Sequence, residues 1–335
     1  MDRKKVDVII PCYKPGKRFL ELIAKLEKQT YPVNHIYIMN TEEKYFTNLV
    51  YGHQFETEHK NVTVTHISKM EFDHAATRSE GIAKSDADFF ILMTDDALPK
   101  DDTLVEELIK PIESGEAAAS YARQLPNKDC RYIEKYTRVF NYPKKSMIKS
   151  SQNLKSMGIK TFFFSNVCAA YDRKIFDKLG GFVNFAIFNE DMLYAYKLIE
   201  KGYKIAYVAE ANVYHSHNYS NMQQLHRNFD LGVSQAEHPE VFKKFPSTGE
   251  GKRLVRMTTR FLKKQGKAYM IPRLYISSAY KFLGYKLGTN YRKLPEKLVM
   301  KLTMNREYWL KKNIRDAASR IDPYSGYGIS KEERK

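Results

Sequence analysis

Apolar residues in the first 115 positions follow two alternating patterns. Four segments predict strands, at residues 6–11, 35–40, 62–67 and 88–94, and the first of them is an apolar, β-branched run. Between and after these segments, apolar residues recur at helical spacing and predict helices, at residues 19–26, 75–84 and 104–109. Strands that alternate with helices are typical of a mainly parallel sheet with helices on its faces. The pattern therefore predicts a mixed α/β fold.

Several residues with useful chemistry stand at the ends of these predicted strands. In an open α/β sheet, ligands bind beyond the carboxyl ends of the strands. We therefore expect one binding edge on the sheet. The residues at such ends are Pro11, Cys12, Tyr13, Asn40, Asp95 and Asp96.

The middle of the chain is less regular. Residues 126–160 are polar and rich in Lys, Ser and Tyr, and we expect them to form an insertion or loop over the active face. Residues 188–203 predict a helix with Asn189 as its N-terminal cap and Gly202 at its end. Residues 204–217 predict one or two late strands.

Charge divides the chain into two parts. The net charge is +17, and residues 251–335 hold 22 basic and 6 acidic residues, so the first 250 residues are nearly neutral. The basic part also carries apolar and aromatic residues at helical spacing, which predicts basic amphipathic helices. We therefore expect a catalytic domain at residues 1–250 and a basic helical extension at 251–335.

The basic extension indicates an anionic partner. Basic residues that bind nucleic acid spread across a groove beside a reading motif. Here the charge is confined to segments rich in Leu, Tyr and Phe, beside a neutral body. This distribution favours an anionic membrane surface and argues against nucleic acid. The simpler alternative is that these helices pack on the main domain with their basic faces in solvent.

The cysteines and the N-terminus favour a cytoplasmic location. Cys12, Cys130 and Cys168 lack metal or redox spacing, and so small and odd a set suggests a reducing compartment. The first apolar run is short and ends at Pro11, so we interpret it as a strand rather than a signal peptide. No run of 18 apolar residues predicts a transmembrane helix. Residues 247–253 hint at a phosphate loop but lack its spacing.

Two adjacent carboxylates, Asp95 and Asp96, follow the fourth predicted strand. Like charges repel, so a positive partner is expected near them. Mg²⁺ and Mn²⁺ bind carboxylate oxygens and share their coordination with phosphates. A divalent cation that holds a sugar-nucleotide diphosphate would supply this charge and stabilise the leaving nucleotide. A pair of solvated aspartates in a turn is the alternative.

Three further groups could complete such a site. Glu190 and Asp191 begin the predicted helix, where they either interact with the helix dipole or supply a general base for an acceptor hydroxyl. His215 and His217 alternate along a predicted strand, so they share one face and could ligate the metal or contact phosphate. Ordinary surface or core histidines are the alternative. Arg78, one strand before the aspartates, could contact the diphosphate.

The order of these motifs resembles family-2 glycosyltransferases, which have the Rossmann-like GT-A fold. The motifs run from PCY through Arg78, TDDALP, GGF and NED to the histidine pair, and the resemblance covers about residues 5–218. It implies that the first two strand ends hold the nucleotide, that the aspartate motif binds a divalent metal, and that the second acid of NED is the base of an inverting transfer. The implied donor-binding residues are Pro11, Cys12, Tyr13, Asn40, Glu42, His74, Arg78 and Asp95. The implied metal ligands are Asp96, Asp95, His217 and His215, the catalytic acids are Asp191 and Glu190, and Asn166 is the implied acceptor-binding residue.

Within that family, residues 72–82 and 94–99 resemble rhamnosyltransferases that use dTDP-rhamnose to build bacterial surface polysaccharides. This resemblance implies a lipid-linked saccharide acceptor at the cytoplasmic face of the membrane. PCYK, IMNTEE and Ser79 depart from the usual family pattern, so the base and the sugar of the donor stay open. Transfer of galactose or glucose from a UDP donor is the alternative. A scaffold without catalysis is disfavoured, because the acids and histidines are all present.

Overall fold

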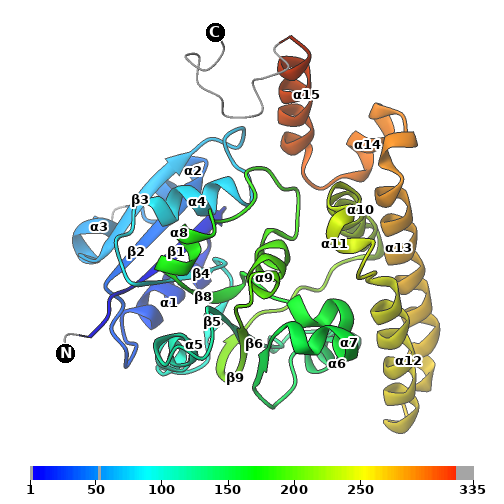
Figure 1. The fold of residues 1–335 in the computed structure, drawn as a ribbon, viewed down its shortest axis with the longest axis horizontal. Helices are drawn as coiled ribbons and strands as arrows, with labels where there is room; N and C mark the ends of the chain where they lie inside the picture. The colour runs from blue at the N-terminus through cyan, green and yellow to red at the C-terminus, as the bar shows by residue number, and fades with distance from the viewer. Residues whose placement is uncertain (1–2, 52–53, 322–335) are drawn as a thin grey trace.

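The computed structural model describes residues 3–51 and 54–321, and the predicted frayed tail at 322–335 lies outside them (Figure 1). The strands are β1 (Val6–Tyr13), β2 (His35–Thr41), β3 (Val62–Ile67), β4 (Phe89–Met93), β5 (Leu98–Pro99), β6 (Ala119–Leu125), β7 (Met147–Lys149), β8 (Cys168–Asp172) and β9 (Ile205–Tyr214). The helices before β9 are α1 (Lys17–Leu26), α2 (Glu43–Leu49), α3 (Phe55–Glu58), α4 (Ala76–Ala83), α5 (Leu104–Glu113), α6 (Tyr132–Asn141), α7 (Leu154–Met157), α8 (Arg173–Lys178) and α9 (Glu190–Glu200). Those after it are α10 (Asn221–Glu237), α11 (Pro239–Phe242), α12 (Thr248–Lys264), α13 (Ile271–Thr289), α14 (Glu296–Leu302) and α15 (Arg306–Ile321).

The described strands form one sheet in the order β3-β2-β1-β4-β8-β6-β9-β5, and β7 pairs with β9. Neighbours among β1 to β4 are parallel, and so are β6 and β9. β8 runs antiparallel between β4 and β6, so the strands on its two sides point the same way. The predicted mixed and mainly parallel sheet is confirmed. The carboxyl ends of β1, β2, β4, β6 and β9 therefore lie at one edge.

Helices cover both faces of this sheet (Figure 1). On β1, Val8 and Ile10 pack into one core with Leu22 of α1, whereas Ile9 packs into a second core with Ile82 of α4. A strand buried on both faces is apolar at successive positions rather than at alternate ones. This double burial explains why the first predicted strand is a continuous apolar run.

Of the two alternatives for residues 126–160, the loop is wrong, because α6, β7 and α7 lie within them, and an insertion over the active face stays a prediction. The predicted cap at Asn189 is wrong as well. Asn189 does not cap α9 with its side chain: its backbone is left-handed, with φ of 65°, and its Nδ2 donates to Ser234 Oγ at 3.0 Å. The cap was predicted from the local sequence. The side-chain amide instead bonds to Ser234 of α10, which lies 45 residues further along the chain.

The C-terminal helices pack tightly on the preceding part of the chain. α13 lies along α10 so closely that a Cβ on Gly284 would lie 2.1 Å from the Leu225 carbonyl oxygen. A Cβ on Gly288 would lie 2.1 Å from the Phe229 carbonyl oxygen. Glycine at these two positions is what permits the close backbone contact. α10 and α13 therefore form one packed unit.

The predicted domain boundary falls inside this helical region. α12 begins at Thr248, so residue 250 lies within its first turn, and the discarded phosphate-loop segment forms the start of the same helix. Phe229 of α10 shares an apolar core with Tyr308 and Trp309 of α15. No described helix combines the length and the apolar character needed to cross a membrane. The predicted C-terminal helices are present, and they share their core with residues before the boundary.

Candidate functional site

The start of α9 carries the two predicted catalytic acids. Asp191 Oδ2 accepts a hydrogen bond from the Asn166 backbone N at 3.0 Å, and Oδ1 accepts one from the Met192 backbone N at 2.7 Å. Glu190 Oε1 lies 3.3 Å from Arg78 Nη1 and accepts a hydrogen bond from Asn166 Nδ2 at 3.2 Å. Glu190 is therefore buried against a cation, whereas Asp191 is half-buried and held by backbone N–H groups.

The two acids differ in how readily they ionise. Burial, and then the charge of Glu190, raise the pKa of Asp191 from its usual 3.8 to about 7. Burial opposes ionisation of Glu190 as well, but Arg78, His74 and Asn166 outweigh it, so the pKa of Glu190 is lowered. A carboxyl with a pKa near the working pH is suited to general-base catalysis, because it can both lose and take up a proton.

Asp191 lies close to the end of β4, where the aspartate pair stands. The segment before β8 connects them: the Asn166 backbone N donates to Asp191, and the next carbonyl, that of Val167, accepts a hydrogen bond from Thr94 N at 3.1 Å. Asp95 Oδ2 accepts a hydrogen bond from Tyr13 N at 3.2 Å. Burial raises the pKa of Asp95 to about 6. The ends of β1 and β4 and the start of α9 thus form one region.

Asp96 faces the two histidines. β9 ends at Tyr214, so His215 and His217 follow the strand rather than lie within it. Asp96 Oδ1 is 3.6 Å from His215 Nε2, and Asp96 Oδ2 is 3.6 Å from His217 Nε2. Ligand atoms of the three residues all lie within 4.8 Å of one another. This group, which does not include Asp95, has the composition of a possible metal site.

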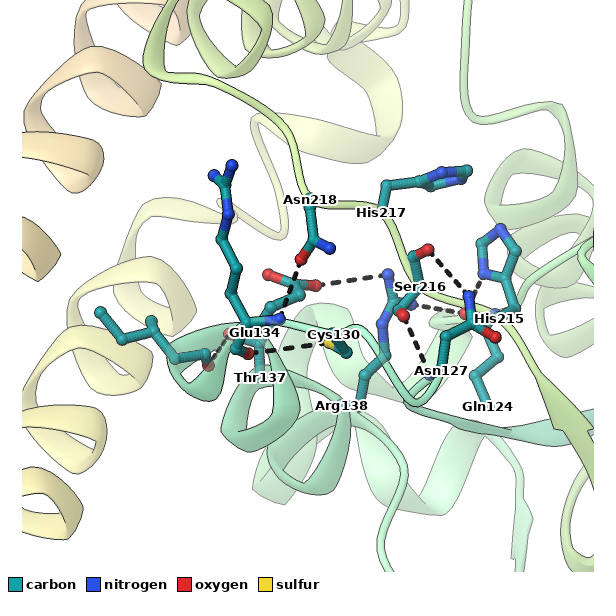
Figure 2. Close-up of polar contacts among 12 residues, drawn as sticks. Gln124, Asn127, Cys130, Glu134, Thr137, Arg138, His215, Ser216, His217 and Asn218 are labelled. Carbon is teal, nitrogen blue, oxygen red and sulfur yellow. Dashed lines mark hydrogen bonds and ion pairs between the residues drawn. The ribbon is translucent and has the colours of Figure 1, made fainter.

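His215 presents an unprotonated nitrogen to Asp96. Its Nδ1 lies 3.0 Å from Gln124 Oε1, which also accepts a hydrogen bond from Arg138 (Figure 2). A guanidinium can only donate, so this Gln124 atom is the oxygen and Nδ1 of His215 carries the hydrogen. Burial lowers the pKa of His215 to about 3, so the ring is neutral. Nε2 and the carboxylate are then two acceptors that face each other, and a cation between them would stabilise both.

Neighbouring loops hold the histidine segment in place. Asn127 after β6 donates its backbone N–H to Ser216 Oγ and its Nδ2 to the Ser216 carbonyl (Figure 2). Arg18 Nη2 donates to Asn127 Oδ1 at 2.7 Å and to the Tyr214 carbonyl at 2.9 Å. These bonds fix the segment from within the protein, as a preorganised ligand site requires.

The ends of β1 and β2 form the predicted donor side. Pro11 lies within β1, opposite Met39. Cys12 Sγ donates to Asn40 Oδ1 at 3.3 Å, and Asn40 Nδ2 lies 2.9 Å from His66 Nδ1. Burial raises the pKa of Cys12, so it stays a thiol. Cys12 and Asn40 are buried, whereas His66 is exposed, so Asn40 connects the buried thiol to the surface.

Two aromatic side chains, Tyr13 at the end of β1 and Tyr45 after the end of β2, belong to the predicted donor side. Tyr13 is exposed and packs edge to face against Tyr45, with ring centres 5.6 Å apart. Glu42 adopts a left-handed backbone, with φ of 65°, and its Oε1 accepts a hydrogen bond from Lys69 N at 2.8 Å. Exposed aromatic faces suit the stacking of a planar base. The nucleotide-binding role of this side remains a prediction.

Two predicted substrate contacts, Arg78 and Asn166, form hydrogen bonds within the protein. Arg78 Nη1 donates to the His74 carbonyl at 2.7 Å and pairs with Glu190. Asn166 Nδ2 donates to Glu190, and its Oδ1 accepts a hydrogen bond from Tyr171 OH at 2.5 Å. Their donor and acceptor roles therefore stay predictions.

Sequence reasoning missed the residues that orient His215. Gln124 and Arg138 belong to no motif and lie 91 and 77 positions before it in the chain. The sequence offers no clear signal for them, because residues 119–125 mix apolar and polar types; the structure shows that Gln124 is buried, and buried polar groups need partners.

Comparisons with known proteins identify the family. Residues 7–180 match the family described as Glycosyl transferase family 2. The O-antigen chain rhamnosyltransferase RfbN of Salmonella typhimurium is 36% identical over 307 residues, which cover 91% of this chain and 96% of the relative. The O-antigen chain rhamnosyltransferase WbaN of Salmonella anatum is 37% identical over 305 residues, which cover 90% of this chain and 95% of the relative.

A solved structure shares the fold. The mannosyltransferase PcManGT from Pyrobaculum calidifontis, in complex with GDP-Man and Mn²⁺, aligns with a TM-score of 0.59 at 14% identity over 88% of this chain and 89% of that chain. The likeness confirms the predicted GT-A fold. The family match spans more than half of the chain, and the relatives span about nine-tenths of it. The chain is therefore a glycosyltransferase that belongs to family 2.

Proposed function

We propose that the protein transfers rhamnose from dTDP-rhamnose to a saccharide acceptor in the synthesis of a bacterial surface polysaccharide. The sugar is inferred from two O-antigen chain rhamnosyltransferases that are 36% and 37% identical to the chain. The chemistry is inferred from Asp191, whose pKa is raised to about 7 at the sheet edge that also carries Asp96 and the histidines.

Asp191 is the proposed base. Its ionised carboxylate takes the proton from the acceptor hydroxyl, and the hydroxyl oxygen attacks the anomeric carbon from the face opposite the nucleotide. The new glycosidic bond forms as the bond to the nucleotide diphosphate breaks, so the configuration is inverted. The backbone N–H groups of Asn166 and Met192 hold the carboxylate in position. Asn166 is also proposed to lie next to the acceptor.

Asp96, His215 and His217 are the proposed ligands of a divalent cation, with Asp95 close by. Converging nitrogen lone pairs and a carboxylate fit such an ion. Two imidazole ligands suit Mn²⁺ better than Mg²⁺, which prefers oxygen ligands. A bound cation would neutralise charge on the departing diphosphate.

The membrane partner is proposed to contact α12 and α13, which lie at the outer edge of the molecule (Figure 1). Tyr275, Ile276, Phe282 and Leu283 on α13 are each 50–56% exposed. The exposed basic residues of α12 are Lys252, Arg253, Arg256, Arg260, Lys263 and Lys264. Apolar side chains beside Lys and Arg are typical of helices that lie in a lipid interface. We therefore propose peripheral binding to the anionic cytoplasmic face of a membrane, close to a lipid-linked acceptor.

A donor screen tests the proposed function. Purified protein with Mn²⁺ is mixed with dTDP-rhamnose, UDP-galactose or UDP-glucose, and the melting temperature and nucleotide release are measured. We expect dTDP-rhamnose to stabilise the wild type most, and Asp191→Asn to keep this binding but lose transfer. Selective stabilisation and turnover with a UDP-sugar would contradict the rhamnose assignment and support the alternative donor.

A further inference from the structure

Arg227 on α10 lies between two segments of the site. Its guanidinium carbon is 4.7 Å from the ring centre of Phe188, which precedes the NED motif. The same carbon is 5.6 Å from the ring centre of Tyr219. The Tyr219 ring packs against that of His217, with ring centres 5.0 Å apart. Arg227 therefore borders both the catalytic helix and the histidine segment.

The hydrogen-bonding groups of Arg227 are free. Among the residues that the structure describes, its guanidinium has two aromatic contacts but neither a hydrogen bond nor an ion pair. None of its nitrogen atoms is sealed from solvent. A guanidinium presents five N–H donors in one plane. The two rings fix this plane and leave its edge available to a ligand.

Further positive charge lies nearby. Arg138 Nη2 is 3.3 Å from Glu134, so its charge has a partner. Burial lowers the pKa of Lys281 on α13; Glu134 opposes this change, and Arg138 and Arg227 add to it, so these side chains lie within electrostatic reach of one another. Three basic side chains thus lie in one region, where Glu134 pairs with Arg138. Like charges repel, and an anionic ligand would relieve that repulsion.

We propose that Arg227 binds a phosphate group during glycosyl transfer. The inference rests on the proposed function, because that reaction offers two sources of phosphate: the donor diphosphate and the phosphate that links an acceptor saccharide to its lipid. A guanidinium edge can donate two parallel hydrogen bonds to phosphate. The position of Arg227 beside Tyr219 and Phe188 places such a phosphate next to both motifs.

Two substitutions separate charge from shape. Arg227→Met keeps a long stem against the two rings and removes the charge, whereas Arg227→Lys keeps the charge and removes the paired donors. Arg273→Met, at an exposed position on α13, is the matched control. Binding of inorganic pyrophosphate, dTDP and thymidine is measured by calorimetry with Mn²⁺. Acceptor KM is measured with a phosphate-bearing acceptor and with its dephosphorylated form.

Loss of a charge-assisted contact is expected to weaken phosphate binding roughly 10- to 100-fold. If the donor supplies the phosphate, Arg227→Met weakens pyrophosphate and dTDP binding by this factor and leaves thymidine binding unchanged. If the acceptor supplies it, dTDP binding is retained and only the KM of the phosphate-bearing acceptor rises. In both cases Arg227→Lys lies between wild type and Arg227→Met.

Unchanged dTDP affinity together with unchanged acceptor KM in Arg227→Met would overturn the proposal. The proposed function fails differently, through absence of rhamnosyl transfer by the wild type. Pyrophosphate binding that still depends on Arg227 would then support the phosphate site on its own.

Discussion

Replacement of Asp191 with Asn is expected to change how protein stability depends on pH. Burial and the charge of Glu190 raise the pKa of Asp191 from 3.8 to about 7, a difference of roughly 4 kcal/mol between its two protonation states. Between these two pH values the folded protein holds a proton that the unfolded chain has lost. The free energy of unfolding of the wild type therefore falls as pH rises through this range, and the loss is complete above the folded pKa.

The variant lacks this titration. The side-chain amide of Asp191→Asn would place an N–H group against one of the backbone N–H groups that donate to Asp191 in the wild type, and this costs about 1–3 kcal/mol at every pH. That constant cost cancels when two pH values are compared. Relative to the wild type, Asp191→Asn should therefore gain up to about 4 kcal/mol of unfolding free energy between pH 4 and pH 8. Transfer activity should fall at least about 100-fold, because the amide cannot act as a base.

Urea unfolding at several pH values, followed by fluorescence of the sole tryptophan, Trp309, measures this difference. Trp309 is buried in the core shared by α10 and α15, so its emission reports loss of tertiary packing. Asp86→Asn, at an exposed loop position, is the control and should show no such pH-dependent gain. A stability difference between Asp191→Asn and wild type that stays constant from pH 4 to pH 8 would refute the reasoning.

Three further changes test other parts of the molecule. Mn²⁺ is expected to raise the melting temperature of the dTDP-bound wild type, Asp96→Asn should abolish this rise, and a normal rise in the variant would contradict the cation site. Replacement of Phe282 and Leu283 by Ser should release the protein from anionic vesicles in a co-sedimentation assay, and undiminished binding would exclude the exposed face of α13 as the contact. Gly284→Ala should lower the free energy of unfolding by about 1–3 kcal/mol, because its Cβ would lie 2.1 Å from a carbonyl oxygen of α10. Gly249→Ala, with open space around it, is the matched control, and equal stability of the two variants would argue against the close helix contact.

Much of the sheet could be predicted from sequence because its strands are buried on both faces. Such strands are largely apolar runs, and β4 is fully so, whereas the edge strand β3 alternates Val with Thr and is only partly buried. Asp95 and Asp96 could be placed at the sheet edge for the same reason, since they directly follow the run that forms β4. Asp191 could be placed at a helix start from local pattern alone.

Other features depend on contacts that local pattern does not encode. Gln124 and His215 meet because β6 and β9 are parallel neighbours, although the two residues are 91 positions apart. Asn189 does not cap α9 as predicted, because its side-chain amide donates a hydrogen bond to Ser234 of α10. Arg227 lies near Phe188 and Tyr219 only because α10 packs against the segments that hold them. No sequence motif contains Arg227, so sequence analysis could not identify it.

The packing of α10 and α13 connects the proposed site to the proposed membrane surface. α10 follows the histidine segment after a short link, so His217 and Arg227 lie on one continuous stretch of chain. Glycine contacts hold α13 against α10. On α13, Lys281 lies within electrostatic reach of Arg227, whereas its neighbours Phe282 and Leu283 are exposed. The same helix that packs on α10 therefore also carries the exposed apolar side chains of the proposed membrane surface.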